Sequence, residues 1–262
     1  MQRLRNIGFL ANTSWYLANF RMDLMKALRD RGIGVCAIAP ADSYSERFSE
    51  EGIRYRPVFF KRRDFSPFGK WKTVRELRTI FREEGIDLMH HFTLEAILAG
   101  TLACGKNGPK VVQSVTGMGF VYSGQQVPRR LLRGALTPIL RRCLPRGPII
   151  VENEGDREAI RGIIRGKGRF SVEKIPGGGV DVNHFSPRGQ KLLEDSPGTV
   201  RFLLAGRLLR DKGAGLFVEA VRQYRGNRAE FLLACLPDEG NPDSYSRSEV
   251  EEWAQIPNFR WL

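Results

Sequence analysis

Two cations with glycine neighbours could bind phosphate in the second half of the chain. Arg207 and Lys212 are separated by four residues, and Gly206 and Gly213 flank them. The segment follows an apolar run that predicts a buried strand and precedes a helical pattern, so it predicts a strand-to-helix turn. In open α/β sheets such turns lie where ligands bind, and the N–H groups of the helix N-terminus favour anions. An ordinary loop with solvated charges explains the same residues, and both interpretations stay open at this point.

The elements that would position this turn alternate regularly between strands and helices. Such alternation is typical of βαβ units and of a mainly parallel sheet, so the fold class is α/β. The predicted strands are 6–11, 35–39, 55–60, 87–92, 110–115, 148–151, 172–175, 200–205, 231–236 and 259–262. The predicted helices are 15–30, 43–51, 68–84, 96–103, 128–143, 156–164, 212–224 and 248–254.

Residues 186–199 interrupt the pattern with Pro187, Gly189, Pro197 and Gly198 and have no apolar periodicity. We therefore predict a first domain over 1–185, a linker over 186–199 and a second domain over 200–262. The second domain has about three strands, whereas a doubly wound domain normally has about five or six. On this ground we expect the second domain to be incomplete and the sequence to be truncated at its C-terminus.

Composition narrows the function classes. The 262 residues carry a net charge of +13, which favours a phosphorylated substrate, an anionic membrane or nucleic acid as partner. No aromatic-interleaved basic patch is present, so nucleic acid is not expected. The absence of a Gly-x-Gly-x-x-Gly motif after the first strand argues against a nicotinamide dehydrogenase. Three histidines and four cysteines without paired spacing predict no metal site and a reducing compartment. We find no signal peptide and no run long enough to span a bilayer.

A basic amphipathic helix is predicted over 128–146. Arginines at 129, 130, 133, 141, 142 and 146 alternate with apolar residues. This pattern is typical of helices that lie on an anionic membrane surface. A packed helix with a solvated basic face is the alternative.

Several stretches, in this order, resemble one enzyme family. They are residues 8–14 and 19–22, His90-His91-Phe92-Thr93, Thr116-Gly117-Met118-Gly119, Pro176-Gly177-Gly178-Gly179-Val180-Asp181, and the turn at 206–213. Together they resemble family 4 of the retaining GT-B glycosyltransferases, and within it bacterial transferases that act on polyprenyl-diphosphate-linked sugars. The resemblance covers the whole chain.

The resemblance implies two Rossmann-like domains and a site for a UDP-sugar without a metal or other cofactor. Gly206, Arg207 and Lys212 would bind the donor diphosphate, and Glu239, Asn241 and Pro242 would lie on the nucleobase side. The cleft and acceptor side would be formed by Asn12, Ser14, Tyr16, His91, Thr116, Gly117, Gly119, Asn153 and Glu154. Most of these residues have a structural alternative. The alternatives are helix capping for Asn12, Ser14, Tyr16 and Glu154, a tight turn for Thr116 and the glycines, a polar turn for the loop at 238–242, and a structural role for His91.

The expected function is therefore transfer of a hexosyl or N-acetylhexosaminyl unit to a polyprenyl-diphosphate-linked or other glycan acceptor in surface-glycan or glycoprotein-glycan synthesis. The enzyme would be cytoplasmic and peripheral on the inner face of the membrane. The family's Glu-x7-Glu segment has no counterpart in a matching context, since Glu76 and Glu84 lie in a helix of the first domain. The catalytic acidic residues are thus unknown, and this chain alone is expected to be inactive. The alternative is an inactive fragment that binds acidic lipid or a partner protein.

Overall fold

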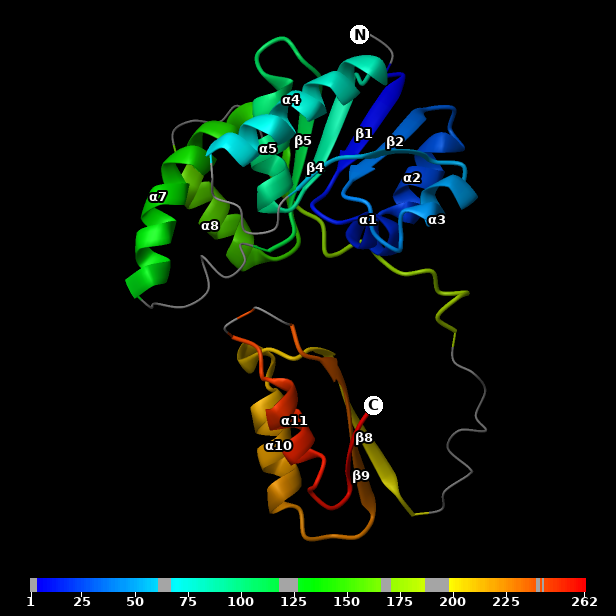
Figure 1. Ribbon diagram of the computed structural model, residues 1–262, viewed down its shortest axis with the longest axis vertical. Helices are drawn as coiled ribbons and strands as arrows, with labels where there is room; N and C mark the ends of the chain where they lie inside the picture. Colours follow the sequence, from blue (N-terminus) through cyan, green and yellow to red (C-terminus); the bar gives the residue numbers. More distant parts are fainter. Residues whose placement is uncertain are drawn as a thin grey trace. The chain divides into compact units, whose positions relative to one another are not determined.

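The computed structural model describes residues 4–60, 67–117, 127–165, 171–186, 198–238, 241 and 243–262. Contacts divide the chain into two units, Met1–Asp181 and Val182–Leu262 (Figure 1). Most of the predicted linker over 186–199 lies outside the described residues.

The first unit is built on a seven-stranded parallel sheet with the order β3-β2-β1-β4-β5-β6-β7. Its strands are β1 (Asn6–Leu10), β2 (Gly34–Ala39), β3 (Arg54–Pro57), β4 (Leu88–Phe92), β5 (Lys110–Val115), β6 (Ile149–Val151) and β7 (Val172–Lys174). The order reverses between β1 and β4, where Phe9 pairs with Ala37 on one side and with His90 on the other. Such a reversal is the usual location of a ligand crevice in α/β sheets, outside the carboxyl ends of the strands.

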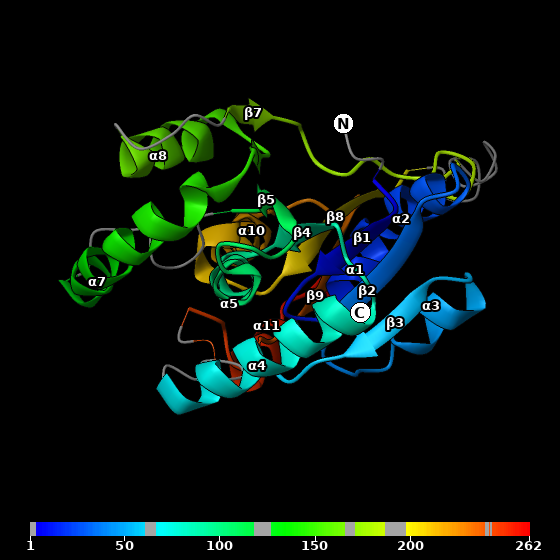
Figure 2. The same cartoon turned by 90° about the horizontal axis from the view of Figure 1, so that it is seen from above.

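Helices cover the two faces of this sheet in two groups, which Figure 2 shows from above. The helices are α1 (Ser14–Phe20), α2 (Met22–Arg29), α3 (Glu46–Glu50), α4 (Pro67–Glu83), α5 (Leu94–Cys104), α7 (Val127–Cys143) and α8 (Glu154–Ile164). Phe9 and Ala37 pack with α1, α2 and α3, whereas Leu10 and Ile38 pack with α4 and α5. Because side chains alternate along a strand, these neighbours define opposite faces of the sheet. The helices α7 and α8 share a core with α5 around Leu140 and Ile160.

The second unit has a three-stranded parallel sheet with the order β10-β9-β8. Its elements are β8 (Val200–Arg207), the 3-10 turn η2 (Arg210–Lys212), α10 (Ala214–Gln223), β9 (Ala229–Leu236), α11 (Arg247–Trp253) and β10 (Phe259–Trp261). One face of the sheet packs against α10 and α11 in a core that contains Leu233, Val218 and Trp253.

Several predicted elements have different limits in the structure: the helix expected over 43–51 is α3 at Glu46–Glu50, and the strand expected over 55–60 is β3 at Arg54–Pro57. Two further differences have a clear cause in the backbone. The helix expected over 15–30 is divided at Arg21 into α1 and α2, since the Arg21 backbone has φ −130° and ψ −1°. The helix expected from Lys212 begins at Ala214, because Lys212 ends a 3-10 turn and Gly213 has a left-handed φ of 83°. Glycine meets little steric resistance in that conformation, which explains its presence there.

Candidate functional site

Residues 206–213, here called the cationic turn, connect β8 to α10 and contain two cations that are exposed to solvent. Arg207 is the last residue of β8, and Lys212 is the last residue of η2. Both are exposed, and neither forms an ion pair with any described residue. The turn closes through a hydrogen bond from the Lys212 N–H to the Leu209 carbonyl at 3.0 Å. Both cations are therefore accessible to an anion at the carboxyl end of the strand.

A third cation in this turn is engaged by the protein itself. The Nη2 of Arg210 lies 3.0 Å from Oε1 of Glu249, and its guanidinium stacks on the Tyr245 ring at 4.3 Å. The bond to Glu249 raises the pKa of Arg210 above its ordinary value. Arg210 thus holds α11 against the turn, whereas Arg207 and Lys212 remain the candidates for ligand binding.

The loop after β9 lies directly beside this turn. Ser244 Oγ donates to the Leu208 carbonyl at 2.9 Å, and the Arg210 N–H donates to the Asp243 carbonyl at 2.9 Å. The Asn241 side chain is used within the loop, where it donates to Asp238 Oδ2 at 2.9 Å and accepts from the Asp243 N–H at 3.1 Å. The structure thus brings Asn241 to the turn, while Glu239 and Pro242 lie outside the described residues.

In the first unit, polar groups gather where the strand order reverses. Asn12 follows β1 and donates from Nδ2 to Glu95 Oε2 at 3.3 Å, in the first turn of α5. Thr93, between β4 and α5, has φ 70°, and its buried hydroxyl has no hydrogen-bond partner among the described residues. A β-branched residue in this conformation is strained, and such strain is common at functional sites.

A second polar cluster, formed by Tyr16, Arg21, Thr116 and Glu152, lies at the same end of the sheet. Arg21 Nη2 donates to the Tyr16 hydroxyl at 2.6 Å and lies 3.2 Å from Glu152 Oε1. Thr116 also interacts with the Tyr16 hydroxyl. Burial raises the pKa of Tyr16, and Arg21 partly offsets this rise. Tyr16 and Thr116 were expected in the cleft from the sequence. The other two members, Arg21 and Glu152, were not assigned to the site by sequence reasoning.

Two expected cleft residues are instead inside the core. Ser14 is fully buried and donates from Oγ to the Pro40 carbonyl at 2.7 Å. The helix cap is Thr13, whose side chain accepts from the Tyr16 N–H, so Ser14 does not cap the helix. His91 is fully buried, and burial lowers its pKa to about 3. Since no surface of His91 is exposed, its burial favours the structural alternative over contact with an acceptor.

The remaining expected residues have local roles. Asn153 caps α8 by accepting from the Asp156 N–H at 2.8 Å. Glu154 is the first residue of α8 and lies 3.3 Å from Lys174 Nζ, and the bond to Lys174 lowers the pKa of Glu154. Gly117 has φ 106°, which requires a glycine-like conformation. Gly119 lies outside the described residues.

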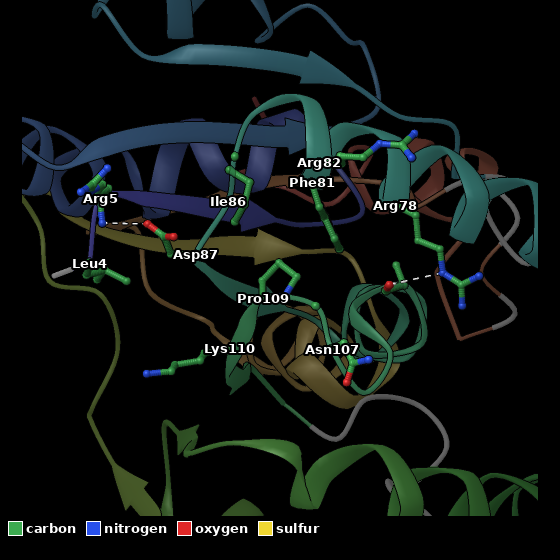
Figure 3. A pocket seen from close by; sticks show the side chains of 13 residues that line it. Leu4, Arg5, Arg78, Phe81, Arg82, Ile86, Asp87, Asn107, Pro109 and Lys110 are labelled. Atoms are coloured by element: carbon green, nitrogen blue, oxygen red, sulfur yellow. Dashed lines mark hydrogen bonds between the residues drawn. The ribbon is translucent and has the colours of Figure 1, made fainter. Parts of the chain in front are cut away.

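A hollow of about 830 Å³ lies at the other end of the same sheet. Leu4 and Arg5 precede β1 there, Asp87 precedes β4, and Lys110 begins β5. Figure 3 shows Arg5, Asp87 and Lys110 on one side and Arg78 on the other. The hollow is therefore separate from the polar clusters, which lie at the carboxyl ends of the strands. In the part of the chain that the structure describes, no group of histidine, cysteine or acidic residues could hold a metal ion.

The sequence contains a signal that could have identified Arg21. Leu17, Arg21 and Met25 are spaced by four residues, and Leu17 and Met25 are both buried. A charged residue on the apolar face of a helical pattern is expected to have a buried partner. Glu152 has no comparable signal, because it approaches Arg21 only through the pairing of β6 with β5.

Several solved structures match this chain over almost its whole length, and its fold, α/β with parallel sheets, is of the GT-B class. Sucrose-phosphate synthase from Thermosynechococcus elongatus matches with a TM-score of 0.76 and 16% identity, over 98% of this chain and 70% of that one. Anabaena Alr3699/HepE in complex with UDP and glucose matches with a TM-score of 0.67 and 18% identity, over 98% of this chain and 69% of that one.

Residues 17–148 match the family described as "Glycosyl transferase 4-like domain", and the chain belongs to this family. A curated relative is N,N'-diacetylbacillosaminyl-diphospho-undecaprenol alpha-1,3-N-acetylgalactosaminyltransferase of Campylobacter jejuni, which is 26% identical over 252 residues. The match covers 92% of this chain and 65% of the relative, so the chain spans just under two thirds of that protein's length.

Proposed function

We propose that this chain is part of a glycosyltransferase. The enzyme would transfer a hexosyl or N-acetylhexosaminyl unit from a UDP-sugar to a lipid-diphosphate-linked glycan, with retention of configuration. The relative from Campylobacter jejuni supports the acceptor class, since its name specifies a diphospho-undecaprenol-linked sugar. Solved complexes of Anabaena Alr3699/HepE with UDP-glucose support the donor class. We place the donor in the second unit and the acceptor at the carboxyl ends of the strands of the first.

The observation that carries the donor proposal is the contact between the cationic turn and the loop that contains Asn241. Ser244 and Leu208 join the two segments, so Arg207 and Lys212 are in the same part of the second unit as the loop of Asn241. This proximity supports a site that would bind a diphosphate at the cations and a nucleobase at the loop. When the sugar–oxygen bond breaks, negative charge grows on the leaving diphosphate. Fixed cations at Arg207 and Lys212 would stabilise that charge and lower the barrier.

A binding measurement tests this proposal without requiring turnover. Arg207→Ala should weaken UDP binding in isothermal titration calorimetry by about tenfold or more, because a charge-assisted contact is lost. Arg222→Ala is the matched control, since Arg222 is an exposed cation in the last turn of α10, away from the turn. Equal affinities of the two variants for UDP would contradict the assigned role of Arg207.

We also propose that α7 binds the inner face of the cytoplasmic membrane. Arg141, Arg142 and Ile139 are exposed, whereas Leu140 packs inward, so this part of the helix presents cations beside an apolar side chain. Cations near an anionic leaflet each contribute about 1 kcal/mol. The described helices include none that is both long and apolar enough to cross a membrane. The four buried, unpaired cysteines support a reducing compartment.

Co-sedimentation with vesicles tests the membrane proposal. A double variant, Arg141→Gln and Arg142→Gln, should bind phosphatidylserine-containing vesicles less than the unmodified protein. Arg161→Gln on α8 is the control, because Arg161 is also an exposed helical cation. Equal pelleting of the unmodified protein with neutral and anionic vesicles would contradict the electrostatic mechanism.

A further inference from the structure

Arg21 divides the helix that the sequence predicts over 15–30. Arg21 is only 9% exposed, and its backbone leaves the helical conformation between α1 and α2. Hydrogen bonds continue on both sides, from the Arg21 N–H to the Leu17 carbonyl and from the Met25 N–H to the Arg21 carbonyl, each at 3.0 Å. The interruption therefore directs one charged side chain inward without loss of these two bonds.

The buried guanidinium connects three elements at the carboxyl end of the sheet. It bonds to Tyr16 in α1 at 2.6 Å, pairs with Glu152 after β6 at 3.2 Å, and lies 4.9 Å from the centre of the Phe92 ring at the end of β4. Burying an arginine costs several kcal/mol unless it is paired and hydrogen-bonded. These contacts offset that cost. The Nε of Arg21 has no hydrogen-bond partner among the described residues.

A fourth element, the glycine-rich segment after β7, packs on the same guanidinium. A Cβ atom placed on Gly178 would lie 2.7 Å from Arg21 Nη1 and 3.0 Å from the Phe20 carbonyl oxygen. The backbone of residues 175–180 can approach this closely only because position 178 has no side chain. In Figure 1 the segment leaves β7 and passes beside α1.

We propose that Arg21 is a positioning residue that fixes both the Tyr16 hydroxyl and the segment 175–180 at the carboxyl edge of the first sheet. Nη2 of its planar guanidinium bonds to Tyr16 and Glu152, whereas Nη1 faces Gly178. A lysine would keep the charge but not this geometry. The effect on sugar transfer rests on the proposed function, whereas the effect on the segment does not.

Hydrogen–deuterium exchange measured by mass spectrometry tests the structural part. In Arg21→Gln and Arg21→Lys, amide exchange in 175–180 should become about tenfold faster or more, and Arg31→Gln, an exposed cation just after α2, should leave it unchanged. Gly178→Ala disturbs the same contact while retaining Arg21, and it should also accelerate exchange there. Unchanged exchange in Arg21→Gln or in Gly178→Ala would overturn the proposal.

Steady-state kinetics of the complete enzyme to which this chain belongs tests the consequence for transfer. Arg21→Lys should raise the acceptor KM by roughly ten- to hundredfold and leave the donor KM unchanged, because the displaced groups lie in the first unit. A change confined to the donor KM would overturn the assignment to the acceptor side. If the complete enzyme to which this chain belongs transfers no sugar to any lipid-diphosphate acceptor, the proposed function fails, while the exchange experiment on this chain still decides the role of Arg21.

Discussion

Gly100 gives a sharp test of the packing in the first unit, because two opposing effects of Gly100→Ala can be compared. Gly100 lies inside α5, where alanine is normally preferred to glycine by about 1 kcal/mol. The new methyl carbon, however, would lie 2.4 Å from His91 Nε2 and 2.7 Å from Leu10 Cδ2. His91 and Leu10 are both fully buried, so neither can move into solvent.

The magnitude follows from these contacts. Overpacking of a core costs about 1–3 kcal/mol, and two buried neighbours at such short distances place Gly100→Ala near the upper end. After the gain of about 1 kcal/mol in helix propensity, we expect a net loss of about 2 kcal/mol in the free energy of unfolding. Gly162→Ala in α8 is the matched control, since a Cβ there meets no atom within 4 Å and should gain about 1 kcal/mol.

Urea denaturation followed by circular dichroism measures the difference. The midpoint should fall for Gly100→Ala and rise for Gly162→Ala, with unchanged m values, and the two variants should differ by about 3 kcal/mol. If Gly100→Ala is as stable as the unmodified protein, or more stable, the close packing of α5 on His91 is refuted.

Three further predictions concern pH, capping and thiols. The pKa of His91 is about 3 in the folded protein because the ring is buried, and about 6.5 when unfolded, so the unfolded state binds the proton first and stability declines as pH falls below 6.5. His91 alone should contribute a loss of about 2 kcal/mol at pH 5. Burial also lowers the pKa of His90 to about 3, so His90 adds to the total loss. The loss should therefore be smaller in His91→Gln than in the unmodified protein, and equal losses would contradict the prediction. Ser246→Ala should lower the free energy of unfolding by about 1 kcal/mol in urea titrations, because the Ser246–Glu249 capping box of α11 is lost. All four cysteines are buried, and burial raises the pKa of Cys36 and Cys104 to about 12, so Ellman's reagent should react rapidly with four thiols only after unfolding.

The order of elements could be predicted because their signals are local. The apolar runs identified β1 and β9, and Gly206 and Gly213 bounded the turn between β8 and α10. Some helix ends could not be predicted from local signals. The start of α10 depended on the left-handed Gly213, and the break at Arg21 depended on contacts with distant residues.

The candidate site could be predicted only in part, because some of its contacts join residues that are far apart in the sequence. Arg207 and Lys212 follow from the turn that contains them, and both are exposed in the structure. His91 and Ser14 carry polar side chains near strand ends, which makes them plausible site residues, but each points into the core.

The sequence by itself therefore determined the α/β class, the succession of strands and helices, and the cationic turn, because each depends on residues close together in the chain. Only the tertiary structure decided that Ser244 bonds to Leu208 and that Arg21 reaches Glu152. These contacts join residues 36 and 131 positions apart, and they form because parallel strands bring their carboxyl ends to one edge of a sheet.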